Sequence, residues 1–231
     1  MAAETPAIAL LWGQRAAPKR GPKPTLSLDA IAAAGIGIAD ADGLAAVTMQ
    51  RVAEQLGVTK MALYRYVPGK VELVALMIDL GLGEPPQLGG ITGGWRPKLD
   101  TWARRMFDRF WAHPWALEVT VGARAIGPNE LGWLEQATAA LTGTGLAGAE
   151  ILDAAVTLVG HVRMVAQQGA AMADGPERTM DDAIGALLTA REDRFPALAA
   201  ALADPAGKDQ ALDFGLQCIL DGVERLIDRR N

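Results

Sequence analysis

Tyr64, Arg65 and Tyr66 follow one another near the N-terminus, and the two tyrosines are the only ones in the chain. If this segment is an α-helix turning about 100° per residue, Arg65 points away from the apolar side formed by Leu63 and Val67. The tyrosines then flank the outward face. A guanidinium can contact guanine through two hydrogen bonds, and phenol groups can reach phosphates. The pattern therefore favours a helix that reads a DNA major groove.

Neighbouring side chains suit the same chemistry. Met61 and Ala62 also point outward, where either can meet a thymine methyl group. Lys60 lies at the tip of this helix, and Lys70 starts the next one, where it is placed for a phosphate with help from backbone N–H groups. The alternative is a small three-helix core with half-buried tyrosines at its edge. This alternative explains any one of these residues, but it explains less well why all of them occur together.

Capping residues and apolar spacing predict the helices that position these side chains. Ser27 and Thr48 are expected to cap two helices, and Gly57 is expected to close the second in a left-handed conformation. Two short helices joined by a tight glycine turn form a helix-turn-helix. The helices predicted in this way span 27–42, 48–57 and 58–67, with a fourth beginning at Lys70.

Charge is distributed unevenly along the chain of 231 residues. The formal net charge is −5, yet residues 13–70 hold 8 lysines and arginines against 4 aspartates and glutamates, a net +4. Part of this excess lies in a Pro/Gly-rich arm that includes Lys19, Arg20 and Lys23. Alone, such an arm is most simply an extended, solvated tail. Beside a helix-turn-helix, we expect it to contact DNA phosphates.

The segment TMQRVAEQLGVTKMALYRYVPGKVEL, residues 48–73, strongly resembles the DNA-binding domain of TetR/AcrR-family transcriptional regulators. The match runs from about 27 to 80 and includes the specific pattern L-Y-x-x-[VF]-x-x-K. Arg65 departs from the aromatic residue often found at its position, so the preferred operator does not carry over. The arm LWGQRAAPKRGPKP, residues 11–24, resembles actinobacterial members. By this resemblance the DNA contacts carry over to Thr48, Gln50, Thr59, Lys60, Ala62, Tyr64, Arg65, Tyr66 and Lys70.

The resemblance also implies an organisation and a function. The fold is expected to be all-α, with a basic arm (1–26), a helix-turn-helix DNA-binding domain (27–80) and a helical ligand-binding and dimerisation domain (81–231). The expected partners are a palindromic double-stranded DNA operator, a second copy of the chain and a small, apolar or aromatic effector. The chain would then be a ligand-responsive regulator, a repressor released from its operator by that effector.

Two helices of the C-terminal part are apolar over wide arcs. One is predicted over 149–172, and the other begins near Leu212. Small residues would allow close approach, which suits an intermolecular four-helix bundle. Filling a large monomer core is the alternative, and the family resemblance favours dimerisation. The predicted dimer contacts are Ile151, Ala155, Leu158, Val162, Val165, Leu212, Leu216, Ile219, Val223 and Leu226.

Tryptophans gather in the same part of the chain. A lining of aromatic rings and methionines with few polar groups would suit an apolar, drug-sized ligand. Core packing alone explains an aromatic stripe more often than a pocket does, and a histidine in mid-helix is more often a hydrogen-bonded core residue. The candidate pocket residues are Trp102, Met106, Phe110, Trp111, Trp115, Trp133, His161, Met164 and Gln167.

Other function classes find little support. The paired carboxylates at 181–182 and 192–193 lie in polar stretches without a histidine nearby, and no nucleophile elbow, phosphate loop or metal-ligand spacing occurs. We therefore expect no enzyme, cofactor or metal. A third possibility is a protein-interaction adaptor that kept the fold without DNA binding. The Tyr-Arg-Tyr face and the basic arm argue against it, and gel-shift assays would decide.

Cysteine content and hydropathy favour a reducing, cytoplasmic compartment. Cys218 is the only cysteine, which excludes an internal disulfide framework. No apolar run approaches the roughly eighteen residues of a membrane span. The run at 8–12 is short and lacks a basic leader, so we expect no signal peptide.

Overall fold

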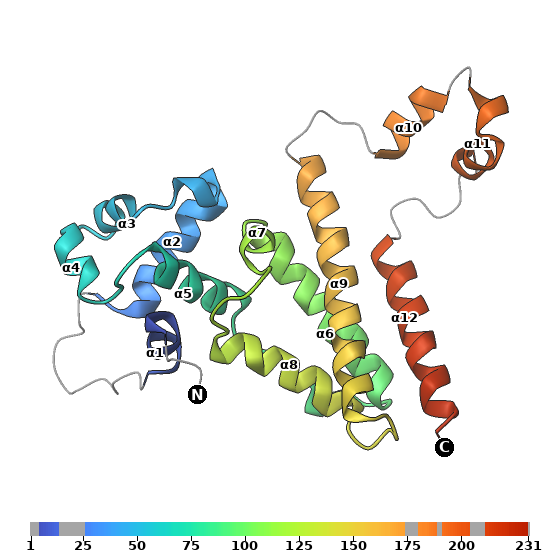
Figure 1. Ribbon diagram of the computed structural model, residues 1–231, viewed down its shortest axis with the longest axis horizontal. Coiled ribbons are helices and arrows are strands. Elements are labelled where there is room, and N and C mark those ends of the chain that lie inside the picture. The colour runs from blue at the N-terminus through green and yellow to red at the C-terminus, as the bar shows by residue number, and fades with distance from the viewer. Residues whose placement is uncertain (1–4, 14–25, 174–179, 189–190, 204–210, 231) are drawn as a thin grey trace.

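The computed structural model describes residues 5–13, 26–173, 180–188, 191–203 and 211–230. Within these ranges the chain forms helices joined by turns and loops, which confirms the all-α prediction (Figure 1). The N-terminal helices are α1 (Pro6–Trp12), α2 (Leu28–Asp42), α3 (Met49–Gln55), α4 (Lys60–Tyr64) and α5 (Lys70–Leu82). The following helices are α6 (Trp95–Ala112), α7 (Ala116–Val119), α8 (Pro128–Leu141), α9 (Gly148–Ala173), α10 (Met180–Leu188), α11 (Pro196–Ala203) and α12 (Ala211–Asp228).

Side-chain caps begin the N-terminal helices where the sequence predicts them. The hydroxyl of Ser27 accepts from the Ala30 N–H at 3.1 Å, and that of Thr48 accepts from the Arg51 N–H at 3.1 Å. Gly57 has φ +65°, the left-handed conformation that lets the chain turn sharply between α3 and α4. The predicted helix-turn-helix is therefore present.

One helix is shorter than predicted. α4 ends at Tyr64 instead of Val67, and the chain continues in a turn in which the N–H groups of Tyr66 and Val67 both donate to the Leu63 carbonyl. Pro68 explains the difference, because a proline disfavours the helical conformation in the residue before it. Val67 is still fully buried, so the turn keeps the predicted apolar side inward.

A packed core holds the N-terminal helices together. α2 lies against α5, and Ile31, Leu73 and Met77 are fully buried between the helices. Gly35 permits this close approach, since a Cβ there would lie 2.7 Å from the Met77 sulfur. α1 also packs on α5, and the Trp12 indole N–H donates to the Ile126 carbonyl at 2.9 Å.

The C-terminal helices form a bundle in which α9 packs against α6, α8 and α12. Trp102 on α6 and Trp133 on α8 meet edge to face, with ring centroids 6.1 Å apart. At the N-terminal end of α9, the Ala147 N–H and the Arg230 guanidinium hold the pKa of Glu150 below its usual value. Within the described ranges, every helix is too short or too polar to cross a bilayer.

The burial of α9 and α12 corrects the predicted dimer contacts. Ala155, Leu158 and Val162 on α9 are completely buried within a single chain, as is Leu216 on α12, and Val223 is 5% exposed. These side chains fill the core between helices of the same chain, so they offer no surface to a second copy, and their assignment to the interface is wrong. The remaining predicted contacts, Ile151, Val165, Leu212, Ile219 and Leu226, are half-buried or exposed.

Candidate nucleic-acid interface and apolar cavity

The predicted DNA-reading residues lie on and beside α4, at one end of the molecule (Figure 1). Leu63 is fully buried and anchors the helix, whereas Met61 is 72% exposed. Tyr64 and Tyr66 are 38% and 40% exposed, so each ring is partly packed while the phenol remains at the surface. Arg65 is exposed between them, and Ala62 is half-buried. Tyr64, Arg65 and Tyr66 are thus all exposed at the C-terminal end of α4.

Three cations of this surface keep their charge available. Lys60, Arg65 and Lys70 are all exposed, and none forms an ion pair with an acid of the described residues. Lys60 instead lies over the Tyr64 ring, 5.8 Å from its centroid. Nearby Arg51 differs, because it is paired with Asp42. Free positive charge is what binding to phosphates requires.

The polar residues that flank α3 and α4 are partly engaged in the fold. Thr48 and Thr59 use their hydroxyl oxygens as caps, which leaves each hydroxyl hydrogen available to a phosphate. Gln50 donates to Glu54 at 2.6 Å along α3. The predicted arm residues Lys19, Arg20 and Lys23 lie outside the described residues.

An apolar cavity of about 200 Å³ lies among α6, α8 and α9. Four of the predicted pocket residues, Trp102, Met106, Phe110 and Trp133, form part of its wall. Its other apolar lining residues are Leu82, Ile126, Leu131, Leu134 and Val159. The aromatic and methionine lining expected from the sequence is therefore present, although it comes from fewer of the predicted residues.

Five predicted pocket residues lie elsewhere. Trp111 is 52% exposed and stacks on Phe107, and Met164 is also 52% exposed on the outside of α9. The His161 Nε2 is 3.1 Å from the Leu212 carbonyl, so this histidine joins α9 to α12. Trp111, Met164 and His161 occupy other faces of the helices that line the cavity, because helical spacing alone does not say which face meets the cavity. The remaining two, Trp115 and Gln167, line a different cleft.

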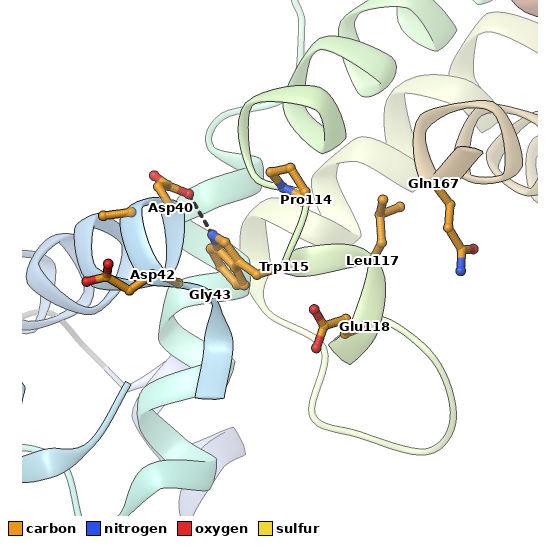
Figure 2. A pocket seen from close by; sticks show the side chains of 10 residues that line it. Asp40, Asp42, Gly43, Pro114, Trp115, Leu117, Glu118 and Gln167 are labelled. Atoms are coloured by element: carbon orange, nitrogen blue, oxygen red, sulfur yellow. Dashed lines mark hydrogen bonds between the residues drawn. The ribbon is translucent and has the colours of Figure 1, made fainter. Parts of the chain in front are cut away.

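That cleft, of about 590 Å³, lies between the C-terminal end of α2 and the start of α7 (Figure 2). Figure 2 shows Trp115 pointing toward Asp40 of α2, and its indole N–H donates to the Asp40 carboxylate at 2.7 Å. The His113 Nδ1 lies 2.9 Å from the same oxygen. One carboxylate thus joins α2, which packs against α3 and α5, to the end of α6, which lines the apolar cavity.

A second carboxylate joins the two parts of the chain at α8. Asp79 on α5 is only 4% exposed, and its Oδ1 accepts from the N–H groups of Asn129 and Glu130 at 2.9 and 3.2 Å. These are N–H groups of the first turn of α8, which have no partner within the helix. Gly127 is required beside them, since a Cβ would overlap the Asp79 carboxylate.

The polar residues of the apolar cavity were not predicted from the sequence. They are Thr120, Arg124, Glu130 and Arg163. Arg124 forms an ion pair with Glu130, and both side chains are largely shielded from solvent. Arg163 had a sequence signal that could have revealed it, because it is a charged residue within the apolar run from Val162 to Val165 in the middle of a long helix. Within the described residues, no group of potential ligands suits a metal ion.

Two parts of this chain match known family models. Residues 31–77 match "Bacterial regulatory proteins, tetR family", and residues 86–227 match "Tetracyclin repressor-like, C-terminal domain". The HTH-type transcriptional repressor DrrR1 of Streptomyces coeruleorubidus is 37% identical over 237 residues, covering 96% of this chain and 86% of the relative.

Solved structures show the same fold. Apo ActR from Streptomyces coelicolor has a TM-score of 0.79 at 23% identity, covering 90% of this chain and 99% of ActR. ActR in complex with actinorhodin has a TM-score of 0.75 at 25% identity, covering 87% of this chain and 98% of ActR. The fold of this chain thus has counterparts among solved TetR-family structures.

Proposed function

The chain belongs to the TetR family of bacterial regulatory proteins, and on that basis we propose that it is a transcriptional repressor controlled by a small effector. In this proposal a homodimer binds a palindromic operator and leaves it when the effector occupies the apolar cavity. The observation that carries the proposal is the exposed Tyr64-Arg65-Tyr66 group at the end of α4, beside cations that form no ion pair within the described residues. The name of DrrR1 supports repression, and ActR with actinorhodin supports control by a small molecule. We therefore assign the binding of DNA and of an effector to this chain, and no catalytic reaction.

The surface around α4 suggests a division of roles on DNA. Arg65 lies at the centre of the outward face, where a guanidinium can read guanine from the major groove. Tyr64 and Tyr66 flank it toward the phosphates, and Lys70 at the start of α5 adds a cation there. We assign phosphate contacts also to the arm residues Lys19, Arg20 and Lys23. Because the partner is chromosomal DNA, the proposed location is the cytoplasm.

Replacing Arg65 and Lys70 separately tests this division. Arg65→Ala should relax base preference about tenfold or more, since a bidentate base contact contributes roughly 1–3 kcal/mol of discrimination. Lys70→Ala should weaken binding to all sequences alike and reduce the salt dependence by about one phosphate contact. Fluorescence anisotropy with operator and scrambled DNA measures both effects. Arg105→Ala, which removes an exposed arginine of α6, should change neither. Equal behaviour of the first two variants would refute the role assignment.

We divide the chain into an arm (1–26), a DNA-binding domain (27–80) and a ligand-binding and dimerisation domain (81–231). The dimer surface proposed in place of the buried stripe is the outer face of α9 and α12. Val156 and Phe214 are 64% and 73% exposed there, and Leu152, Met164 and Leu226 are also exposed. A Cβ added to Gly160 or Gly222 would meet nothing within 4 Å, so a second chain can approach these positions closely.

The carboxylate junctions give the effector a route to the DNA-binding domain. α6 lines the cavity with Trp102, Met106 and Phe110 and ends next to His113, which contacts Asp40. An effector that prefers a shifted position of α6 would therefore shift α2 as well. A coupling free energy of about 1–3 kcal/mol would lower operator affinity several-fold to a hundredfold.

Removing the Asp40 carboxylate should loosen this junction. In Asp40→Ala the N–H of Trp115 and the ring of His113 lose their acceptor, and a hydrogen bond to a charged group contributes about 1.5–3 kcal/mol. Amide hydrogen exchange at 36–43 and 112–119 should therefore accelerate about tenfold or more, by mass spectrometry. Asp42→Ala, which removes a carboxylate from the same helix end but only its pair with Arg51, serves as the control. Unchanged exchange in Asp40→Ala would contradict the proposed junction.

A further inference from the structure

The polar groups that line the apolar cavity do not balance in charge. Arg124, Glu130 and Arg163 all line the cavity, so two cations stand against one anion. Thr120 adds a neutral hydroxyl beside them. The rest of the wall is aromatic or aliphatic and offers no charge. The balance therefore depends on how these three ionised groups are paired.

Both carboxylate oxygens of Glu130 bind the same partner, Arg124. Its Oε1 and Oε2 accept from separate nitrogens of Arg124, which makes a two-pronged ion pair. Its backbone N–H in turn donates to Asp79, which fixes the residue at the start of α8. The carboxylate of Glu130 is thus occupied, and Arg124 is neutralised by it. A cationic ligand would have to break this pair.

The hydrogen bonds of Arg163 go to neutral acceptors. Its guanidinium donates to the Leu117 carbonyl at 2.8 Å and to the Thr120 hydroxyl, both neutral acceptors. Its guanidinium carbon lies 5.3 Å from the centroid of the Phe110 ring. Within the described residues no carboxylate lies within ion-pair distance of it. Burial, and then the nearby charge of Arg124, lower the pKa of Arg163 below its ordinary value, although the Glu130 carboxylate acts in the opposite direction.

We propose that the cavity selects an aromatic acid, whose carboxylate meets the guanidinium of Arg163 while its rings lie against Trp102, Met106 and Phe110. Arg163 is half-buried and its hydrogen bonds go to neutral acceptors, so it gains more from an anion than from a neutral ligand, because partial burial weakens the screening of its charge. The aromatic walls supply the apolar contact that such cavities use for affinity. This inference rests on the proposed function, since it names the effector class of the same cavity.

A matched pair of probes tests the inference on the full chain. 2-Naphthoate and 2-naphthamide have nearly the same shape, but only the first is charged at pH 7. Quenching of tryptophan fluorescence, from Trp102 and Trp133 in the cavity wall, measures their binding. The native chain should bind the acid at least about tenfold more tightly than the amide, as expected for a charge-assisted pair.

Two substitutions locate the preference. Arg163→Met should abolish the preference for the acid, and Arg163→Lys, which keeps the charge, should retain part of it. Arg105→Met, at an exposed position of α6 outside the cavity wall, should leave the preference unchanged. Circular dichroism and the thermal midpoint show whether each variant is folded. If Arg163→Met does not fold, the reduced preference expected for Arg163→Lys still tests the inference.

The outcomes separate this inference from the proposed function. Equal binding of acid and amide by the native chain, a preference that survives in Arg163→Met, or no binding of either probe would overturn the aromatic-acid class. Operator binding is measured on the same samples. If the native chain still binds the operator in any of those cases, the proposed function stands and only the effector class is wrong. If the native chain shows no sequence-preferring DNA binding, the proposed function itself is refuted.

Discussion

Replacing Asp79 with alanine is expected to lower the free energy of unfolding by about 3 kcal/mol. The carboxylate is 4% exposed and accepts from the first backbone N–H groups of α8, at Asn129 and Glu130. Alanine would leave both donors buried without a partner, and each such group costs roughly 1–3 kcal/mol. Urea denaturation followed by circular dichroism measures the change.

A matched control distinguishes this capping role from a general effect of lost charge. Asp108→Ala removes a carboxylate that is 65% exposed on α6 and lies 4.0 Å from Arg105, so stability should change by less than about 0.5 kcal/mol. Asp79→Asn keeps an acceptor oxygen and should lose less stability than Asp79→Ala. If Asp79→Ala and Asp108→Ala were equally stable, Asp79 would not hold α5 to α8.

Replacing Val156 with aspartate is expected to convert the dimer to monomers and lower operator affinity about a hundredfold. Val156 is 64% exposed on the outer face of α9, which we assign to the contact between two copies. Burying a carboxylate without a partner in an apolar interface costs several kcal/mol. A monomer would hold one half-site and lose the avidity of two linked DNA-binding domains, which is worth about a hundredfold or more.

The control for this variant is a valine of equal exposure outside α9 and α12. Val121 lies in the loop after α7 and is 62% exposed. Val121→Asp should remain dimeric with native operator affinity. Sedimentation velocity gives the oligomeric state, and anisotropy gives the affinity. A dimeric Val156→Asp, or a monomer that binds the operator as tightly as the native chain, would contradict the proposed interface.

Local signals predicted the N-terminal helices well because each depends on neighbouring residues alone. Ser27, Thr48 and Thr59 cap the helices through N–H groups three residues ahead, and Gly57 turns the chain with a positive φ. The end of α4 differs from the prediction because Pro68 disfavours the helical conformation at Val67, although apolar spacing continues to that residue.

The dimer contacts could not be deduced from periodicity. A stripe of apolar residues shows that a helix face is buried, but it does not say whether the same chain or a second chain covers it. On α9 the stripe through Leu158 and Val162 packs within the chain, and the exposed face carries Val156. Because α9 is apolar over a wide arc, only the packing of α6 and α12 against it distinguishes the buried face from the exposed one.

The sequence predicted the aromatic and methionine lining of the cavity, but only some of the residues that form it. Trp102, Met106, Phe110 and Trp133 line it, whereas Trp111 follows Phe110 directly and turns outward. Its charged residues come from a loop, α8 and α9, and no local pattern places Arg124, Glu130 and Arg163 together. Their proximity depends on how Asp79 fixes the start of α8, which is a tertiary contact across 50 residues of sequence.

Selection of bound DNA from a genomic or random library tests the central claim most directly, namely that the α4 surface of a dimer recognises an operator. The full chain should enrich an inverted repeat whose half-sites are centred about 34 Å apart along one face of the duplex, or a multiple of that distance. Binding should weaken steeply as salt is raised, and Arg65→Ala should lose much of the enrichment. No enrichment above the input library, or the same enrichment by Arg65→Ala, would contradict the account.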